Sequence, residues 1–173
     1  GGSLFRVVTY NIHRGIGLDK AYSPERILGV LKSLNGRVVS LQEVDRSLRT
    51  DLVQDHLEYF AKELGQLHVM SRTMYQNGGE YGNAVLTDLN VQNSQSLDLT
   101  YKRREPRMAL IMEIESPNGE IFCLVNVHLG LRRSERRAQF QRLVQHLEQY
   151  RDQKVILTGD FNEWLYGEKF FEP

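Results

Sequence analysis

Hydrophobic and polar residues follow one another along this chain in an order that predicts a mixed α/β fold. An apolar, β-prone run over residues 4–12 predicts a first strand. Ser-Pro-Glu at 23–25 then predicts a helix start, because serine caps a helix, proline fits its first turn and an acid is favoured near its dipole. Asn-Gly at 35–36 supplies the stop, and a second strand follows at 38–44. This strand–helix–strand order predicts a parallel, right-handed unit.

The remaining pattern predicts further strands and helices. They are a second helix at about 52–64, short strands at about 67–73 and 83–87 separated by a glycine-rich loop, a hairpin over 108–129, a third helix capped by Ser134, and a final strand, KVILTGDF, at 154–161. The apolar stripe of the third helix is expected to consist of Phe140, Leu143, Val144, Leu147 and Tyr150. Mixed parallel and antiparallel strands with interspersed helices predict a layered α/β sandwich.

Length and composition limit the class of protein. The 173 residues are enough for one compact domain with a sizeable core. The 22 basic residues balance the 22 acidic ones, so no global positive field argues for binding to a polyanion. The single cysteine, Cys123, lies in an apolar run and is expected to be a small buried residue, in keeping with a reducing compartment.

The sequence shows neither an apolar span nor the layout of a signal peptide. No apolar stretch approaches the roughly 18 residues that a membrane-spanning helix needs. We therefore expect a cytoplasmic protein. Gly-Gly-Ser at 1–3 is typical of a tag remnant, and residues 4–173 are expected to form the domain.

Four of the β-prone runs end in polar clusters that carry chemical groups. The clusters are TYNIH (9–13), SLQEVD (40–45), VNVHLG (125–130) and LTGDFNEW (157–164). Open α/β sheets gather their chemistry at strand ends of this kind. The candidate residues are Asn11, Glu43, His128, Asp160 and Asn162. An oxygen-rich set with one imidazole suits a hard divalent cation and a phosphate better than zinc or an acyl group, so it indicates a metal-dependent phosphoester hydrolase.

Taken in order, TYNIH, LQEVD, GNAVLT, NVHLG and GDFN resemble the endonuclease/exonuclease/phosphatase superfamily, which has the DNase I-like fold. The resemblance extends from Phe5 onward and is greatest to small bacterial members of the phosphodiesterase or nuclease kind. It implies a four-layer sandwich in which two mixed β-sheets pack face to face with helices outside. It also implies an active site at one rim of that sandwich.

The resemblance also implies a role for each candidate residue. Glu43 would be the principal ligand of Mg²⁺, with Mn²⁺ as a substitute, and Asn11 would lie beside the metal and the scissile phosphate. His128 would contact the phosphate. Asp160 would orient and activate the attacking water, and Asn162 would stabilise the crowded phosphorus centre. These roles agree with the chemistry, because attack on an anionic phosphodiester needs a cation and donors aimed at the developing charge.

Two further groups are candidates for contact with the substrate phosphate. The run at 102–107, KRREPR, is the densest basic stretch, and its REP resembles an arginine-bearing segment of DNase I-like nucleases. Arg104 or Arg107 could bind a phosphate there through a bidentate guanidinium. Asn83, in GNA, would add an amide near the phosphate.

The chain departs from the family pattern after GDFNEW. In the family a further aspartate and a Ser-Asp-His strand complete the site, and this motif is not found in the 173 residues. Two explanations are open: either the sequence is part of a longer protein, which we favour, or the domain is truncated and inactive. On the first explanation the domain is incomplete at its C-terminal side and lacks its last strands and part of the catalytic set.

Several functions remain compatible with these residues. The leading hypothesis is Mg²⁺-dependent hydrolysis of a phosphoester, preferably a phosphodiester, by in-line attack of water, as in a phosphodiesterase or nuclease. Within that class, a sphingomyelinase-like phospholipid phosphodiesterase and a small-molecule phosphatase are alternatives. The expected partner is therefore a phosphoester such as a nucleic acid or a phospholipid head group. A non-catalytic binding module that retains the scaffold, or a metal-binding structural protein, would be a hypothesis of another class.

Overall fold

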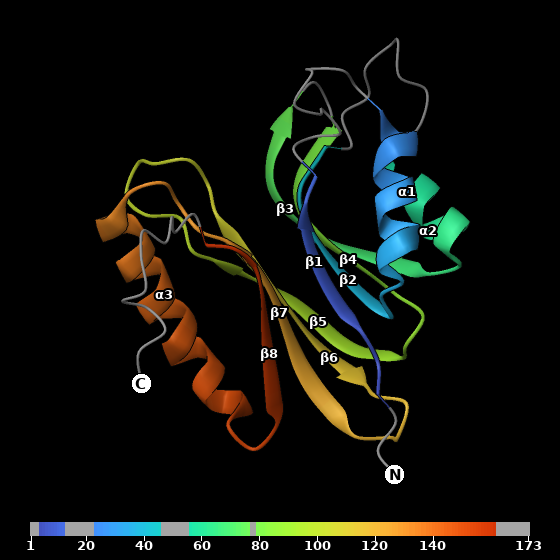
Figure 1. Ribbon diagram of the computed structural model, residues 1–173. Helices are drawn as coiled ribbons and strands as arrows, with labels where there is room; N and C mark the ends of the chain where they lie inside the picture. The colour runs from blue at the N-terminus through green and yellow to red at the C-terminus, as the bar shows by residue number, and fades with distance from the viewer. Residues whose placement is uncertain (1–3, 13–22, 46–55, 77–78, 162–173) are drawn as a thin grey trace, which may run out of the picture.

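The computed structural model describes residues 4–12, 23–45, 56–76 and 79–161 (Figure 1). Two four-stranded mixed β-sheets pack face to face, with helices α1 and α2 against the first sheet and α3 against the second. The four-layer sandwich predicted from the sequence is confirmed.

The first sheet has the strand order β1-β2-β4-β3, and the second has the order β5-β6-β7-β8. The strands are β1 (Val7–Asn11), β2 (Val38–Asp45), β3 (Leu67–Gln76), β4 (Gly79–Thr87), β5 (Val91–Asp98), β6 (Met108–Glu115), β7 (Ile121–His128) and β8 (Lys154–Asp160). The helices are α1 (Pro24–Leu34), α2 (His56–Leu64), α3 (Arg133–Leu147) and the short 3-10 helix η2 (Glu148–Tyr150). Among the helices in this described part of the chain, none is both long and apolar enough to cross a membrane.

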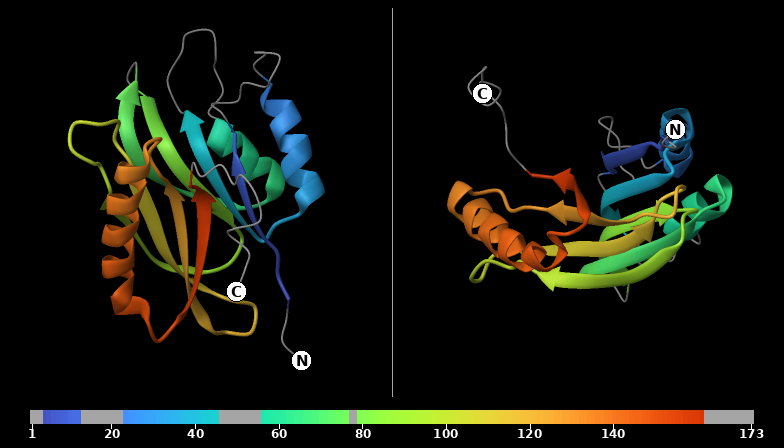
Figure 2. Two further views of the ribbon diagram at one scale, coloured as in Figure 1. Left: turned by 60° about the vertical axis from the view of Figure 1, so that its left-hand side comes forward. Right: turned by 90° about the horizontal axis from the view of Figure 1, so that it is seen from below.

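Each sheet contains one parallel pair of strands, and these two pairs end at the same rim. β1 runs parallel to β2, as predicted, and Asn11 lies opposite Gln42. β7 runs parallel to β8, with His128 opposite Asp160. In the left view of Figure 2 the blue, cyan, orange and red arrowheads of these four strands all point toward the upper end of the molecule. The carboxyl ends of the parallel strands therefore gather the polar clusters at one edge of the sandwich.

Local signals in the sequence account for α1 as predicted. The Ser23 hydroxyl accepts a hydrogen bond from the Arg26 N–H at 3.3 Å and so caps the helix. Asn35 ends the helix in the left-handed conformation (φ 50°), and its N–H donates to the Leu31 carbonyl. The buried face of α1 packs on the outer face of the first sheet.

The core consists of three apolar layers because neighbouring strand residues point to opposite faces. Val39 faces outward toward α1 and α2, where Phe60 is fully buried, whereas its neighbour Val38 faces inward between the sheets. The third layer lies under α3 and includes Leu143 and Cys123. Cys123 is fully buried, as expected, and burial raises the pKa of its thiol to about 11.

The structure contains strand residues that the sequence pattern does not predict. β5 (VQNSQSLD) lies at the edge of the second sheet, and most of its side chains are polar and exposed, so it lacks the apolar alternation expected of a strand. β3 extends to Gln76 and β4 begins at Gly79, so most of the glycine-rich loop predicted between about 73 and 83 is strand and that prediction is wrong. Gly79 and Gly82 have a low strand propensity, but antiparallel pairing of β4 with β3 overrides it.

The third helix also differs from its prediction. It begins at Arg133, and its N-cap residue Arg132 makes no side-chain capping bond, so the predicted cap at Ser134 is wrong. The residues of α3 that are buried are Glu135, Gln139 and Leu143, spaced four residues apart. Two members of the predicted apolar stripe, Phe140 and Val144, are 43% and 44% exposed. The helix therefore packs through a face that is partly polar, which a hydrophobic pattern cannot reveal.

Candidate active site

The paired ends of β7 and β8 place His128 beside Asp160. The backbone N–H of Leu129 donates to the Asp160 carbonyl at 2.9 Å, which extends the pairing past the end of the sheet. Gly159, with φ 141°, lies so close to β7 that a Cβ atom there would stand 1.8 Å from the Val127 carbonyl oxygen. Only glycine allows this approach, and it brings the Asp160 carboxylate to the rim.

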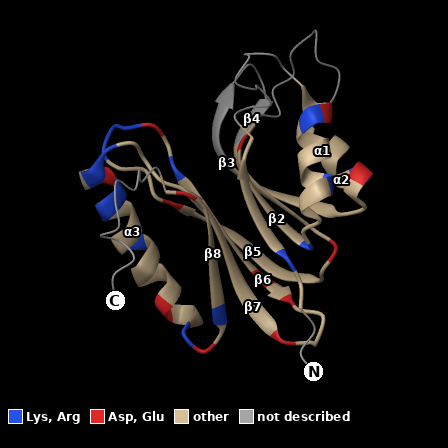
Figure 3. Cartoon of the chain, in the orientation of Figure 1, with Lys and Arg blue, Asp and Glu red and all other residues tan. Residues whose placement is uncertain are grey.

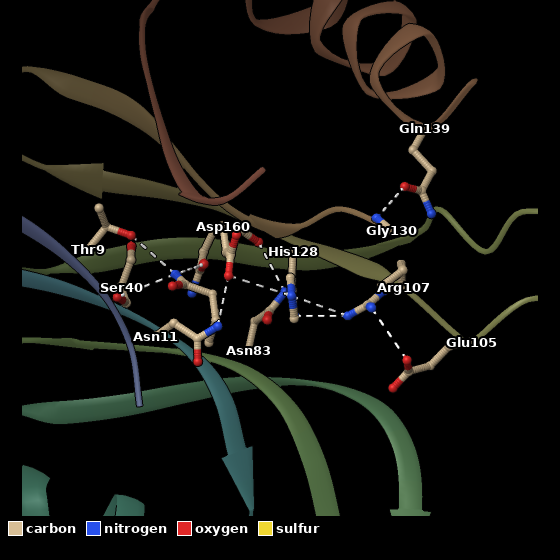
Figure 4. A network of polar contacts seen from close by, with 12 residues as sticks. Thr9, Asn11, Ser40, Asn83, Glu105, Arg107, His128, Gly130, Gln139 and Asp160 are labelled. Carbon is tan, nitrogen blue, oxygen red and sulfur yellow. Dashed lines mark hydrogen bonds and ion pairs between the residues drawn. The ribbon is translucent and has the colours of Figure 1, made fainter. Parts of the chain in front are cut away.

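Asn11 joins the end of the first sheet to the end of the second. Its Nδ2 donates to Oδ2 of Asp160 at 2.8 Å, although the two residues are 149 positions apart in the chain. Figure 4 shows these two side chains meeting, with His128 on the other side of Asp160. The Asp160 side chain keeps 29% of its surface exposed, so the carboxylate remains accessible to a substrate.

Glu43 lies at a β-bulge, where the pairing of β2 with β4 shifts between Leu41 and Val44. It has a left-handed backbone (φ 56°), which is unfavourable for a residue with a Cβ atom. The bulge leaves two carbonyls near the interior, and Nδ2 of Asn126 donates to both of them: Leu41 O at 3.0 Å and Ala84 O at 2.8 Å. A side chain from the second sheet thus supports the distortion that presents Glu43.

A buried amide pair connects the two sheets directly beneath this rim. Nε2 of Gln42 donates to Oδ1 of Asn126 at 2.9 Å, and both residues are almost completely buried. Oγ1 of Thr158 lies 2.8 Å from Oγ of Ser40 and links β8 to β2 nearby. Gln42 and Asn126 were not predicted as site residues. The signal available in the sequence is a lone amide within each of two apolar strands, because a buried amide needs hydrogen-bond partners.

His128 is held between a cation and a carboxylate. Its Nδ1 lies 2.9 Å from Nη1 of Arg107, and its Nε2 lies 3.8 Å from Oδ2 of Asp160. Burial lowers the pKa of His128 and the charge of Arg107 lowers it further, while Asp160, Glu43 and Glu105 act in the opposite direction. The net direction is downward, so His128 is neutral near pH 7.

The two arginines considered for phosphate binding lie in different surroundings. Arg104 is exposed in the turn between β5 and β6, where its N–H donates to the Tyr101 carbonyl at 3.0 Å. In Figure 3 the blue of basic residues marks parts of this loop and the first turns of α3. Arg107 is 6% exposed and lies at the site, with its guanidinium between His128 and Glu105 (Figure 4).

Asn83 lies close to the site but is used by the fold. It is 1% exposed, and its Nδ2 donates to the carbonyls of Met108 at 3.0 Å and Asn126 at 3.5 Å. The Asn83 amide therefore bonds to backbone oxygens of the second sheet and has a structural role. Its expected contact with a phosphate stays a prediction. The other predicted residue of the GDFN motif, Asn162, lies outside the described residues.

The donor set at the rim fits a hard divalent cation. It offers the carboxylates of Glu43 and Asp160 and the amide of Asn11, and all three contribute oxygen. Within the described ranges, no three His, Cys, Asp or Glu side chains are grouped closely enough to hold a metal alone. A Mg²⁺ ion would thus depend on one or two carboxylates, on water and on substrate oxygen, which is its usual environment in enzymes.

Comparison with known protein families identifies the family of the chain. The model of the endonuclease/exonuclease/phosphatase family matches residues 8–168. The chain belongs to this family. Its members are generally hydrolases that act on phosphoesters. A curated relative from Escherichia coli strain K12, the uncharacterized protein YbhP, is 28% identical over 170 residues and is matched over 67% of its length.

Solved structures with low sequence identity share the fold. An endonuclease/exonuclease/phosphatase protein of Beutenbergia cavernae is 19% identical with a TM-score of 0.77, over 92% of this chain and 48% of that protein. ANGEL2, a 2′,3′-cyclic phosphatase, is 17% identical with a TM-score of 0.72, over 92% of this chain and 53% of its own. The chain thus spans about half the length of these two structures.

Proposed function

We propose that the protein hydrolyses phosphoester bonds with the help of Mg²⁺, and that its preferred substrate is a phosphodiester. The observation that supports this most directly is the row of polar contacts at the rim. Asn11 donates a hydrogen bond to Asp160, and Asp160 lies beside His128. Glu43 acts on the same histidine electrostatically, so the acid of the first sheet belongs to the same neighbourhood. ANGEL2 shares the fold and acts on a phosphoester, which supports the reaction class.

The side chains of this rim can divide the work of hydrolysis. Glu43 would hold the Mg²⁺ ion, which, when bound, would neutralise charge on the phosphate and favour attack. Asp160, oriented by the amide of Asn11, would accept the proton that an attacking water loses. His128, being neutral, would donate a hydrogen bond to a phosphate oxygen.

The proposed reaction is an in-line displacement at phosphorus. The water oxygen forms a new bond to phosphorus, and the bond to the leaving oxygen breaks with its electron pair on that oxygen. The leaving oxygen takes a proton from solvent, while the proton of the attacking water passes to Asp160. No covalent intermediate with the protein is required.

The test is hydrolysis of bis-p-nitrophenyl phosphate by the purified full-length protein, measured while Mg²⁺ is titrated. We expect Asp160→Asn to lower kcat by about 100-fold or more, because general acid–base groups commonly contribute factors of roughly 10²–10⁴. We expect Glu43→Gln to raise the Mg²⁺ concentration needed for half-maximal rate. Asp152→Asn, an exposed acid in a turn, is the matched control and should behave as wild type.

Undiminished turnover in both variants would show that the assigned mechanism is wrong. A thermal stability that rises with Mg²⁺, in a protein without turnover, would instead indicate a non-catalytic metal-binding module.

A further inference from the structure

The side chains that face between the two sheets change from apolar to polar toward the rim. In β8 the inward-facing residues are Ile156, Thr158 and Asp160, so a polar residue stands directly beneath the site residue. The same order of an apolar residue, a polar residue and the rim recurs in β1, β2 and β7. The polar residues of these four strands form a polar layer, which consists of Thr9, Ser40, Gln42, Asn126 and Thr158.

Hydrogen bonds join the polar layer within and between the sheets. Nε2 of Gln42 donates to Oδ1 of Asn126 at 2.9 Å in the second sheet and to Oγ1 of Thr9 at 3.2 Å in the first. Oγ1 of Thr158 lies 2.8 Å from Oγ of Ser40. All members except Thr9 are buried, and Figure 4 shows Thr9 and Ser40 at the side of the site. Two bonds of the layer thus connect β2 to β7 and β8 of the other sheet.

Farther from the rim the sheets meet through apolar side chains such as Met112 and Leu124, which are fully buried. Apolar contacts have no preferred direction and can repack, so they hold the sheets together but discriminate weakly between small displacements. Hydrogen bonds require defined distances and angles, and a buried polar group that misses its partner is expensive. The polar layer therefore selects one position of the first sheet relative to the second.

We propose that the polar layer fixes the displacement between the two sheets, and that Thr158 and Asn126 are positioning residues for the site at the rim. They act through the strands and side chains that they hold, and they do not touch the substrate. The part of this proposal that concerns metal binding rests on the proposed function, whereas the position of the sheets does not.

The rim depends on this displacement because its residues come from both sheets. Nδ2 of Asn11 in β1 donates to Oδ2 of Asp160 in β8 at 2.8 Å, so the bond forms only when the two strand ends are level. A shift by one residue along a strand is about 3.3 Å, which would break this bond. Asn126 adds a second connection, since its Nδ2 donates to two backbone carbonyls at the bulge that presents Glu43.

Three variants separate the role of the polar layer from a simple loss of stability. Thr158→Val removes the hydroxyl at nearly constant volume, so the contact with Ser40 is lost. Thr158→Ser keeps the hydroxyl and should behave as wild type. Leu124→Ala is the matched control, because Leu124 is fully buried in the apolar layer between the same two sheets. It should lower the free energy of unfolding without changing the polar layer.

The first measurement is the rate at which the side-chain amide of Asn11 exchanges its hydrogens with solvent, followed by NMR on the purified full-length protein without metal. Its signals are identified by their disappearance in Asn11→Ala. We expect exchange roughly 5–10-fold faster in Thr158→Val than in wild type, the effect that losing one hydrogen bond typically has on an equilibrium. Thr158→Ser and Leu124→Ala should stay close to wild type. Equal acceleration in Leu124→Ala, or none in Thr158→Val, would overturn the proposal.

The second measurement is binding of Mn²⁺ alone, followed by the electron paramagnetic resonance signal of the free ion. We expect Thr158→Val to raise the Kd for Mn²⁺ roughly 10-fold, the lower end of the range usual for residues that orient metal ligands. Asn126→Leu, which also releases the bulge, should raise it further, whereas Leu124→Ala should bind Mn²⁺ as wild type does. An unchanged Kd in both Thr158→Val and Asn126→Leu would contradict the effect on metal binding.

Turnover of bis-p-nitrophenyl phosphate with Mg²⁺ then separates this inference from the proposed function. If wild type neither binds Mn²⁺ nor turns over this substrate, but the exchange of Asn11 follows the expected pattern, the proposed function fails and the positioning role stands. If wild type turns over the substrate, and Thr158→Val has the same Asn11 exchange and the same Mg²⁺ requirement as wild type, the proposed function stands and the positioning role fails.

Discussion

The two sheets present their acids to the rim by opposite means. In the first sheet the distorted residue is Glu43 itself, which adopts a left-handed backbone (φ 56°) at the bulge in β2. In the second sheet the distorted residue is Gly159 (φ 141°), and Asp160 follows it in β8. In the first sheet the unfavourable backbone conformation is therefore adopted by a functional residue, Glu43, and in the second sheet it is adopted by a glycine, Gly159.

Because of this difference, the backbone conformation at Glu43 and at Gly159 should affect the stability of the fold in different ways. A left-handed conformation is unfavourable for a residue with a Cβ atom, and such strain is often found at functional sites. The left-handed backbone of Glu43 is thus expected to lower the stability of the fold, while it directs the carboxylate to the rim. Gly159 is expected to be essential for stability, because the neighbouring strand leaves no room for a side chain. Replacing Gly159 should consequently lower the stability of the fold, whereas glycine in place of Glu43 should relieve the strain of the left-handed backbone.

The largest effect is expected for Gly159→Ala. The added methyl carbon would stand 1.8 Å from the Val127 carbonyl oxygen, so β8 must move away from β7. We expect the free energy of unfolding to fall by about 3 kcal/mol or more, the size typical of severe packing or backbone conflicts. Denaturant unfolding measures it.

Gly29→Ala is the matched control for this substitution. Gly29 lies within α1, and a Cβ atom there would meet nothing within 4 Å. Alanine should stabilise this helix by roughly 0.5–1 kcal/mol. If the free energy of unfolding fell less in Gly159→Ala than it rose in Gly29→Ala, the close approach of β7 and β8 would not be a requirement of the fold.

A smaller loss in the free energy of unfolding is expected for Asn126→Leu, which removes one of the links between the two sheets at nearly constant volume. The carbonyls of Leu41 and Ala84 would each lose the bond from Asn126, and Nε2 of Gln42 would keep Thr9 but lose Oδ1 of Asn126. We expect a loss of about 2 kcal/mol, because buried polar groups without partners are expensive. The double variant with Gln42→Leu should lose less than the sum of the single losses, since both remove one shared bond. Strict additivity would argue against a cooperating amide pair.

Much of this arrangement was accessible from local sequence signals. The cap at Ser23 and the stop at Asn35 define α1, and both are visible without any tertiary information. Polar residues that end apolar strands point to Asn11, His128 and Asp160, which the structure brings together. Prediction succeeded here because strand ends in a parallel pair must share an edge of the sheet.

The rest depended on how the sheets stack, which a local pattern does not contain. Nothing in the sequence indicates that Arg107, and not Arg104, turns inward, because that choice follows from the bonds that Arg107 makes with Leu99 and Thr100 to close the β5–β6 loop. Nor does the sequence indicate that the amide of Asn83 donates to carbonyls of the second sheet. Such contacts join residues far apart in the chain. They are decided by the packing of complete layers.

The smallest effect is expected at Glu43, where comparing two variants isolates backbone strain. Glu43→Ala and Glu43→Gly both remove the carboxylate, so both should raise the Mg²⁺ requirement or abolish turnover under the proposed function. They differ in the cost of a left-handed backbone, which is about 1–2 kcal/mol for alanine and absent for glycine. The greater freedom of glycine in the unfolded chain offsets roughly 0.5–1 kcal/mol of that advantage.

We therefore expect Glu43→Gly to be more stable than Glu43→Ala by about 0.5–1 kcal/mol, measured by denaturant unfolding. At Gly29 in α1, where the backbone is helical, the order must be reversed, with alanine more stable than glycine. The same order at both positions would mean that Glu43 is not strained in solution. The first sheet would then present its acid without reducing the stability of the fold, and the contrast with Gly159 would disappear.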